Sequence, residues 1–318
     1  MRITLLLVLS LTVHLSTAQI TEAESKLRAA GTDTLLGWKK GGLFSLNFSQ
    51  AAFSNWAAGG QNSLSLNTLA SVFVNYKAKN YTWDNMLDVG YGLLQQGSAT
   101  FKTDDKIDFS SKYGRIATKD WYYAALLNFK TQMSPGYNYP DDSTKISDLM
   151  SPGYLLAAIG MDYKPNTHFT AFIAPITVKN TIVTSTALAD IGAFGVDPAE
   201  FDSNGVLISH GKMLRTEYGG YMRIVYKNTF FEDKSVTLLT KLDLFSNYLH
   251  NPENIDVSWE TILGFRVNKY IVATVTVNVL YDDDIDVFVD KNRDGVIDFT
   301  GPRTQLKEVL GIGFAYKF

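Results

Sequence analysis

The 318-residue chain contains no cysteine, which excludes disulfide bonds, thiol catalysis and cysteine-ligated metals. Its charges are nearly balanced, with 29 Lys and Arg against 32 Asp and Glu. No basic surface for nucleic acid is therefore expected. After the N-terminal segment, no run of about 18 apolar residues occurs, so the mature chain offers no candidate for a spanning helix. If the chain crosses a membrane, it must cross with strands that satisfy each other's backbone groups.

The N-terminus has the pattern of a secretory signal peptide. Arg2 is followed by the mostly apolar run 3–15 and by the small residues Ser16 and Ala18 around Thr17. This run is too short to span a bilayer, and no charged stop follows it. We expect cleavage after Ala18, so residues 1–18 form the signal peptide.

The rest of the chain alternates apolar and polar residues, segment after segment. In the segment 63–77, for example, Leu64, Leu66, Val72 and Val74 share one face, while Ser65, Asn67 and Ser71 occupy the other. Such alternation is typical of strands that bury or expose one face only. About 12 such segments can be recognised, at 42–49, 63–77, 82–93, 107–115, 121–132, 154–163, 167–176, 212–226, 235–245, 255–267, 270–281 and 304–318.

The connections between these segments alternate in length. The long ones are expected at 50–62, 94–106, 133–153, 177–211, 246–254 and 282–303. The short ones are expected at 78–81, 116–120, 164–166, 227–234 and 268–269. Long outer loops and short periplasmic turns are typical of outer-membrane barrels. The sequence thus predicts an all-β fold, a transmembrane antiparallel up-and-down barrel of about 12 strands. It would span residues 38–318, after a short periplasmic segment 19–37, in the outer membrane of a diderm bacterium, with both termini periplasmic.

The last strand ends on an aromatic residue. Apolar residues at 310, 312, 314, 316 and 318 alternate with Gly311, Gly313, Ala315 and Lys317. We expect this strand to be recognised by the barrel-insertion machinery through strand addition. We also expect it to pair with the strand 42–49, so that no strand edge is left in the lipid.

The segment from Asp290 to Asp298 matches the start of a calcium loop. Oxygen ligands would come from Asp290, Asn292, Asp294 and Asp298 and from the carbonyl of Val296, with Gly295 making the sharp turn. The twelfth position is Gly301 and not Glu, so the usual bidentate ligand is missing. The alternative is a solvated acidic loop with an Asp-Gly turn. Bound Ca²⁺ would stiffen the last outer loop.

Two short motifs lie near the start of the mature chain. They are Trp38-Lys-Lys-Gly-Gly42 and Asn55-Trp56-Ala-Ala-Gly59-Gly60. On these residues, with the alternating strands behind them, the chain resembles a family of outer-membrane barrels known only as a domain of unknown function. The resemblance implies a barrel and no activity. Asn55, Trp56, Gly59 and Gly60 could fold the first loop inward as a constriction or ligand platform. Alternatively, the glycines only serve a tight loop.

If the apolar face meets lipid, the other face lines the lumen. The charged residues on that face have nearly balanced signs, which favours paired charges in a narrow lumen over a lining of one sign. These residues are Asp84, Asp88, Asp108, Lys112, Lys130, Asp162, Arg215, Glu217, Arg223, Lys241, Asp243, Glu260 and Arg266.

No enzyme is expected. Histidines His168, His210 and His250 are followed two residues later by Thr170, Lys212 and Pro252, so the His-x-Ser arrangement of outer-membrane phospholipases is missing. The expected function is a narrow channel or transporter for small solutes. The alternatives are a non-conducting barrel that binds another envelope protein, and a surface lipid or peptide hydrolase.

Overall fold

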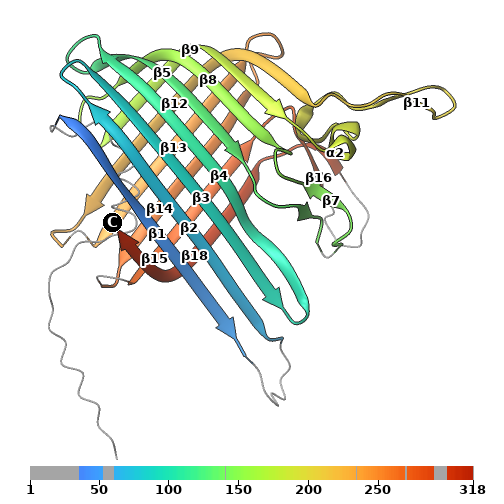
Figure 1. Ribbon diagram of the computed structural model, residues 1–318, viewed down its shortest axis with the longest axis horizontal. Helices are drawn as coiled ribbons and strands as arrows, with labels where there is room; N and C mark the ends of the chain where they lie inside the picture. Colours follow the sequence, from blue (N-terminus) through green and yellow to red (C-terminus); the bar gives the residue numbers. More distant parts are fainter. Residues whose placement is uncertain are drawn as a thin grey trace, which may run out of the picture.

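The computed structural model describes residues 36–52, 61–139, 141–233, 235–268, 271–289 and 299–317. Twelve antiparallel strands close into a barrel (Figure 1). The strands are β1 (Gly37–Ala51), β2 (Ser63–Lys77), β3 (Tyr81–Gln96), β4 (Ala99–Ile116), β5 (Trp121–Thr131), β8 (Gly153–Tyr163), β9 (Phe169–Ile182), β12 (Leu214–Phe230), β13 (Val236–Asn247), β14 (Ile255–Arg266), β15 (Ile271–Tyr281) and β18 (Gln305–Lys317). The predicted fold and strand number are confirmed.

The first and last strands meet and close the barrel, as predicted. Each neighbouring pair along the chain is antiparallel, and β1 pairs with both β2 and β18. Within the described residues, however, the β1–β18 pairing covers only Leu43–Asn47 against Gly313–Lys317. By contrast, β1 pairs with β2 over its full length, from Gly37 to Ala51. The contact that closes the barrel is thus the shortest ladder in it.

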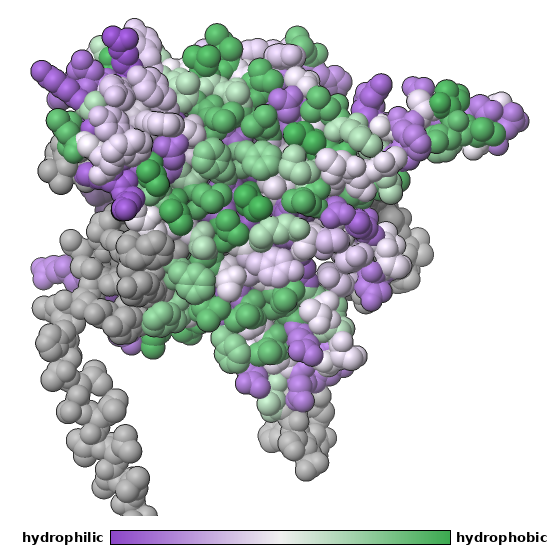
Figure 2. All heavy atoms as spheres, viewed as in Figure 1, coloured by the Kyte–Doolittle hydropathy of each residue, from purple (hydrophilic) through white to green (hydrophobic). Residues whose placement is uncertain are grey.

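The outer face of the strands is apolar. Leu64, Leu66, Val72 and Val74 of β2 are all exposed, as their alternation predicted. In Figure 2, hydrophobic residues gather over the middle of the barrel wall, and hydrophilic residues lie mainly toward its edges. A wall of this kind is what a hydrocarbon environment requires.

An aromatic belt surrounds part of the short-turn end, which is the end of the barrel that carries the short connections. The ring centroids of Trp38 and Tyr76 lie 4.9 Å apart, and Tyr81 lies 5.7 Å from both Tyr76 and Tyr113. On neighbouring strands, the rings of Trp121 and Tyr163 are 4.7 Å apart. Tyr and Trp are enriched where a membrane meets water, because one end of each ring is apolar and the other is polar.

The long connections carry small elements of their own at the opposite, long-loop end. Three short hairpins are formed by β6 (Gly136–Tyr137) with β7 (Lys145–Ser147), β10 (Glu200–Phe201) with β11 (Leu207–Ser209), and β16 (Asp286–Val289) with β17 (Phe299–Pro302). The β10–β11 hairpin projects away from the barrel (Figure 1). At its base, α2 (Thr186–Asp190) and the 3₁₀ turn η1 (Ala193–Gly195) bury a small core around Val183, Leu188 and Val196. None of the helices in the described part of the chain is long and apolar enough to cross a membrane.

One expected long connection is wrong. Residues 94–106 form no loop, because β3 and β4 continue to Gln96 and from Ala99. Only the tight turn around Gly97 joins them, and Gly97 has a φ of +60°, which glycine adopts without strain. Polar residues in this stretch were assigned to a loop, although strands that leave the lipid can carry polar residues on both faces. The alternation of long and short connections therefore fails at this hairpin.

A second boundary is also wrong, for a local reason. The strand 167–176 was expected to end at Ile176, just after Pro175, yet β9 continues to Ile182. The register shifts here, so that Ala174 pairs with Tyr221 and Thr177 with Gly219. Proline fits such a bulge, because it has no N–H to give to the ladder. The bulge switches the pleat, and both Ala174 and Thr177 point inward although they are three positions apart, a spacing that would place them on opposite faces of a regular strand.

Candidate functional site

The middle of the barrel interior carries charges that are paired across neighbouring strands. Arg223 lies directly opposite Asp243, with Nε 2.6 Å from Oδ1 and Nη2 2.9 Å from Oδ2. Lys241 likewise faces Glu260, and Lys130 faces Asp108; their charged atoms are 3.3 Å and 3.9 Å apart. Opposite charges at directly opposed positions are a stabilising cross-strand pair.

A second charged group lies toward the short-turn end. The buried carboxylate of Asp162 accepts hydrogen bonds from Lys112 at 2.7 Å and is 3.1 Å from Lys164 Nζ. Lys164 also lies 3.7 Å from Asp84. Two ammonium groups and two carboxylates thus balance each other inside the barrel, as a low-dielectric interior requires.

A third group lies at the long-loop end of the interior. The ammonium of Lys179 is 2.7 Å from Asp256, 3.3 Å from Asp282 and 3.4 Å from Glu217. Arg215 bonds to Glu217 at 3.1 Å and also pairs with Asp284. This group ties the segment after β15 to strands β9, β12 and β14.

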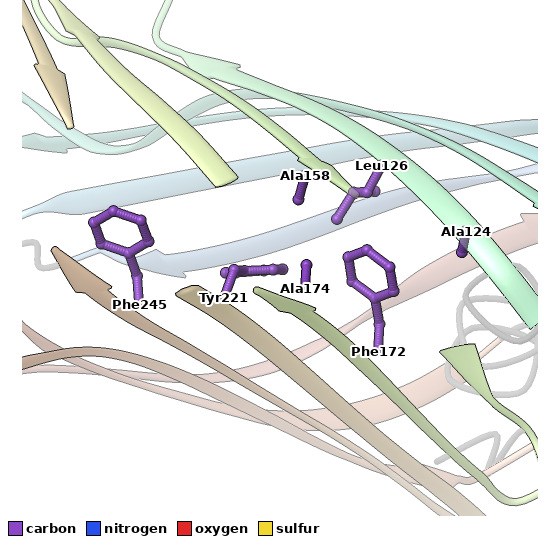
Figure 3. Packing of buried hydrophobic residues seen from close by; sticks show 7 residues of the cluster. All are labelled: Ala124, Leu126, Ala158, Phe172, Ala174, Tyr221 and Phe245. Atoms are coloured by element: carbon purple, nitrogen blue, oxygen red, sulfur yellow. The ribbon is translucent and has the colours of Figure 1, made fainter. Parts of the chain in front are cut away.

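An apolar cluster lies on the inner face of β5, β8, β9, β12 and β13 (Figure 3). Phe172, Tyr221 and Phe245 extend toward Leu126 and alanines on β5, β8 and β9, and all are buried. Lys179 Nζ lies 5.0 Å from the Phe245 ring, and the Arg223 guanidinium lies 5.6 Å from the Tyr221 ring. Aromatic rings and paired cations thus close this side of the lumen. We call the inner face of β5, β8, β9, β12 and β13 the packed half.

The rest of the interior contains a cavity. Its volume is about 730 Å³, and it lies against β1, β2, β4, β14, β15 and β18, near the long-loop end of those strands. We call this the open half. Uncharged polar side chains dominate its inner lining, and they are Ser45, Asn47, Ser65, Asn67, Thr103, Thr274, Thr276, Asn278 and Gln305.

Glycines shape the wall of the open half. A Cβ atom at Gly92 would overlap the side chains of Asn67 and Thr103, and one at Gly313 would overlap Asn47. Thr103 donates a hydrogen bond to Asn67 Oδ1 at 3.0 Å. Because glycine leaves room for them, the two amide side chains can lie along the barrel wall beside the cavity.

One ion pair crosses the open half. Lys307 Nζ on β18 lies 2.8 Å from Asp104 Oδ1 on β4, although β1, β2 and β3 separate the two strands around the barrel. Both side chains border the cavity and are only half-buried. The pair therefore bridges the lumen at the cavity between two strands that are not neighbours in the barrel wall.

The structure places the remaining predicted lumen residues as follows. Asp88 is buried on the inner face of β3. Arg266 lies at the short-turn end, where it donates a hydrogen bond to the backbone carbonyl of Asp233. The side-chain carboxylate of Asp233 is 3.9 Å from the Arg266 guanidinium. The predicted calcium ligands Asp290, Asn292, Asp294, Val296 and Asp298 lie outside the described residues, as do Asn55, Trp56, Gly59, Gly60 and Phe318. In the described ranges, no group of three His, Asp or Glu side chains is arranged to hold a metal.

Several interior charges were missed in the sequence. Asp104 and Lys106 fell in the segment that was assigned to a loop, and Lys179 followed the bulge at Pro175. Lys164 was assigned to a turn. Lys307 lies at a position of the last strand that the alternation assigns to the inner face. Its partner on β4 could not be found without knowing that β4 begins at Ala99. A sign was available in part, because Asp104 and Lys106 lie at the alternate positions that continue to Asp108 and Lys112.

His168, His210 and His250 do not lie beside a pair of carboxylates that are free of other partners, which is the arrangement a hydrolase site would need. His210 Nδ1 is 3.0 Å from Asp190, whose carboxylate also accepts the Gly211 N–H at 2.8 Å. These hydrogen bonds, first that from Gly211 and then that from His210, lower the pKa of Asp190. His250 lies 4.0 Å from Asp284, which is engaged by Arg215. His168 contacts the carbonyl of Lys227 at the short-turn end.

Comparison with known proteins gives a match of one family model to part of the chain, and a likeness to several barrel structures. The profile of a family described as "Protein of unknown function (DUF3078)" matches residues 48–137. No curated protein sequence is significantly similar to the chain.

Among solved structures, the translocator domain of the autotransporter NalP from Neisseria meningitidis is 11% identical, with a TM-score of 0.37, over 93% of this chain and 94% of that one. An outer membrane channel from Pseudomonas putida F1 is 10% identical, with a TM-score of 0.39, over 90% and 97%. The β domain of the Bordetella autotransporter BrkA is 10% identical, with a TM-score of 0.33, over 89% and 100%.

Proposed function

We propose that the protein is an outer-membrane barrel that provides a narrow passive path for small solutes. The observation that carries this proposal is the cavity of about 730 Å³ in the open half of the lumen. Its volume lies within the range of small-molecule sites in proteins. Its lining of hydroxyl and amide groups can replace the hydrogen bonds that a polar solute gives up when it leaves water.

The membrane location rests on the wall of the barrel. An apolar outer face and an aromatic belt at the short-turn end suit a barrel that crosses a bilayer. In this proposal, the short-turn end and both ends of the mature chain face the periplasm. The last strand would be recognised by the insertion machinery, and outer-membrane lipid would surround the wall.

The path is tested by flux measurements on the purified barrel. In planar bilayers we expect small current steps, and in proteoliposomes we expect swelling with glycerol. Heat-denatured protein in the same vesicles is the control. A barrel that shows neither current nor glycerol flux would contradict the proposal.

The packed half favours a second candidate, a non-conducting barrel that binds another envelope protein. Its ion pairs and aromatic cluster fill much of the lumen, and a filled lumen needs no solute. The β10–β11 hairpin offers a contact for such a partner, because Phe201, Val206 and Ile208 are exposed on it. Chemical crosslinking in intact cells, with and without residues 200–209, tests this candidate, and identical crosslinks in both would contradict it.

A further inference from the structure

The seam between β1 and β18 opens beside the cavity. The paired residues end at Asn47 and Gly313. In the same register, Gln50 would face Leu310, yet no pairing continues there in the described chain, although β1 extends to Ala51 and β18 begins at Gln305. The two strands therefore separate toward the long-loop end.

The cavity reaches around the edge of β18 at this gap. It borders the consecutive residues Gln305 to Leu310. Successive side chains of a strand point to opposite faces, so this stretch of β18 brings residues of both faces to the border of the cavity. Lys307 and Val309 face the lumen, whereas Leu306 and Leu310 belong to the outer face and are 69% and 72% exposed. The cavity is thus continuous with the apolar outer surface.

Two features accompany the separation of the strands. Asn47 lies where the pairing ends, and its amide occupies the space that a side chain at Gly313 would need. Further along, the ion pair with Asp104 draws Lys307 across the lumen toward β4 and away from β1. The half-exposed pair contributes little stability, so it can favour the separated arrangement without locking it.

We infer that this seam is a lateral binding site for a single-chain amphipathic molecule with an uncharged polar head. The head would lie in the lumen against Asn47, Asn67 and Thr276, and the hydrocarbon chain would lie outside against Leu306 and Leu310. This inference rests on the proposed membrane location, and it names a ligand class for the same cavity.

The uncharged head follows from the charges around the cavity. Lys307 is engaged by Asp104, and Glu260 is engaged by Lys241. A charged head would lose its hydration without gaining a free counter-charge from these two residues, which is unfavourable. Hydroxyl or amide groups instead match the donors and acceptors of the wall.

A photo-crosslinking experiment tests the site directly. The barrel is reconstituted in phosphatidylcholine vesicles with a diazirine analogue of octanoylglycerol, and labelled residues are mapped by mass spectrometry. We expect labels concentrated on residues 306–310 and 47–51, and at least about tenfold less labelling there by the anionic octanoate analogue, equal to about 1.4 kcal/mol. Labels spread evenly around the outer face would overturn the site, and equal labelling by octanoate would overturn the ligand class.

Closing the seam provides the matched variant, because the chain has no native cysteine. Gln50→Cys with Leu310→Cys would join the separated strands, whereas Leu46→Cys with Phe314→Cys joins a pair that already faces each other. On oxidation, we expect the 46–314 disulfide to form at least about tenfold faster. Lys307→Gln should increase the rate at which the 50–310 disulfide forms. Once formed, this disulfide should remove labelling by the octanoylglycerol analogue.

Equal rates for the two disulfides would overturn the open seam. If the 50–310 disulfide does not form, the gap between the strands is too wide for it. In that case Leu310→Gln serves as the test variant. The control is Val275→Gln, because Val275 is the outer-face residue that pairs with Leu310 on β15. Loss of labelling only in Leu310→Gln supports the site, and equal labelling in both variants overturns it. Glycerol flux is measured in every variant, so that the two hypotheses can fail separately. If the barrel has no solute path, no variant and no parent protein shows flux. If the seam is not a binding site, the labels are dispersed over the outer face whether or not flux is present.

Discussion

The two halves of the lumen are built from the same alternating strands but filled in different ways. In the packed half, aromatic side chains lie between cross-strand ion pairs such as Arg223–Asp243. In the open half, the corresponding inner positions carry serine, threonine and asparagine, or glycines such as Gly92 and Gly313. Side-chain volume on one face decides whether a 12-stranded barrel interior is solid or hollow. One wall is thus built for stability, and the other leaves room for a ligand.

The largest effect is expected from breaking an ion pair in the packed half. Asp243→Asn leaves the buried Arg223 without its carboxylate partner, and we expect it to cost about 3–5 kcal/mol in the free energy of unfolding. Asp104→Asn, in the half-exposed pair of the open half, should cost at most about 1 kcal/mol. Reversible urea unfolding in lipid vesicles measures both. Equal losses would mean that the two halves do not differ as described.

Filling the open half should remove flux without affecting the fold. Thr276→Trp places an indole in the cavity, whereas Val277→Trp places the same group on the outer face of β15. We expect Thr276→Trp to lose most of the glycerol flux, and Val277→Trp to keep it. The unfolding midpoints of both variants should stay close to that of the parent protein. Unchanged flux in Thr276→Trp would show that solutes take another route.

A smaller effect is expected in the long connection between β9 and β12. The pKa of Asp190 is lowered in the folded protein, so its hydrogen bonds stabilise the loop above the ordinary carboxyl pKa of 3.8 and are lost as the pH falls through the lowered value. Amide hydrogen exchange around Gly211 should therefore lose protection on acidification below that range. Asp190→Asn should abolish this pH dependence, and Asp142→Asn in another loop should not. A parent protein whose protection is constant down to strong acid would refute this role.

The smallest effect concerns the segment 290–298, for which calcium binding stays a prediction. β16 and β17 bring its two ends together, since Val289 pairs with Phe299. Without a glutamate at the twelfth position, we expect a dissociation constant on the order of 0.1–1 mM by isothermal titration calorimetry. Asp290→Asn combined with Asp294→Asn should abolish the heat signal, and a signal retained in that variant would exclude these ligands.

The sequence was sufficient to predict the barrel but not the division of its lumen. Alternation along each strand depends on local residues only, so all 12 strands and the β1–β18 closure could be predicted. The Lys307–Asp104 pair depends on where β4 begins and how the walls approach, which no local pattern contains. The bulge at Pro175 shows the same limit, because one added residue reversed the faces of the following segment and concealed Lys179. Cavities and ion pairs across the lumen are properties of the closed barrel and not of a strand.

Thiol accessibility tests the central claim, that one half of the lumen is packed and the other open. Single cysteines can be introduced at Thr274 and Asn278 in the open half and at Ala158 and Ala174 in the packed half, in a chain without other thiols. A water-soluble, membrane-impermeant methanethiosulfonate reagent is then added to the folded barrel in vesicles. We expect rapid modification at 274 and 278, and none at 158 and 174 until the protein is unfolded. Equal reactivity at all four positions would contradict it.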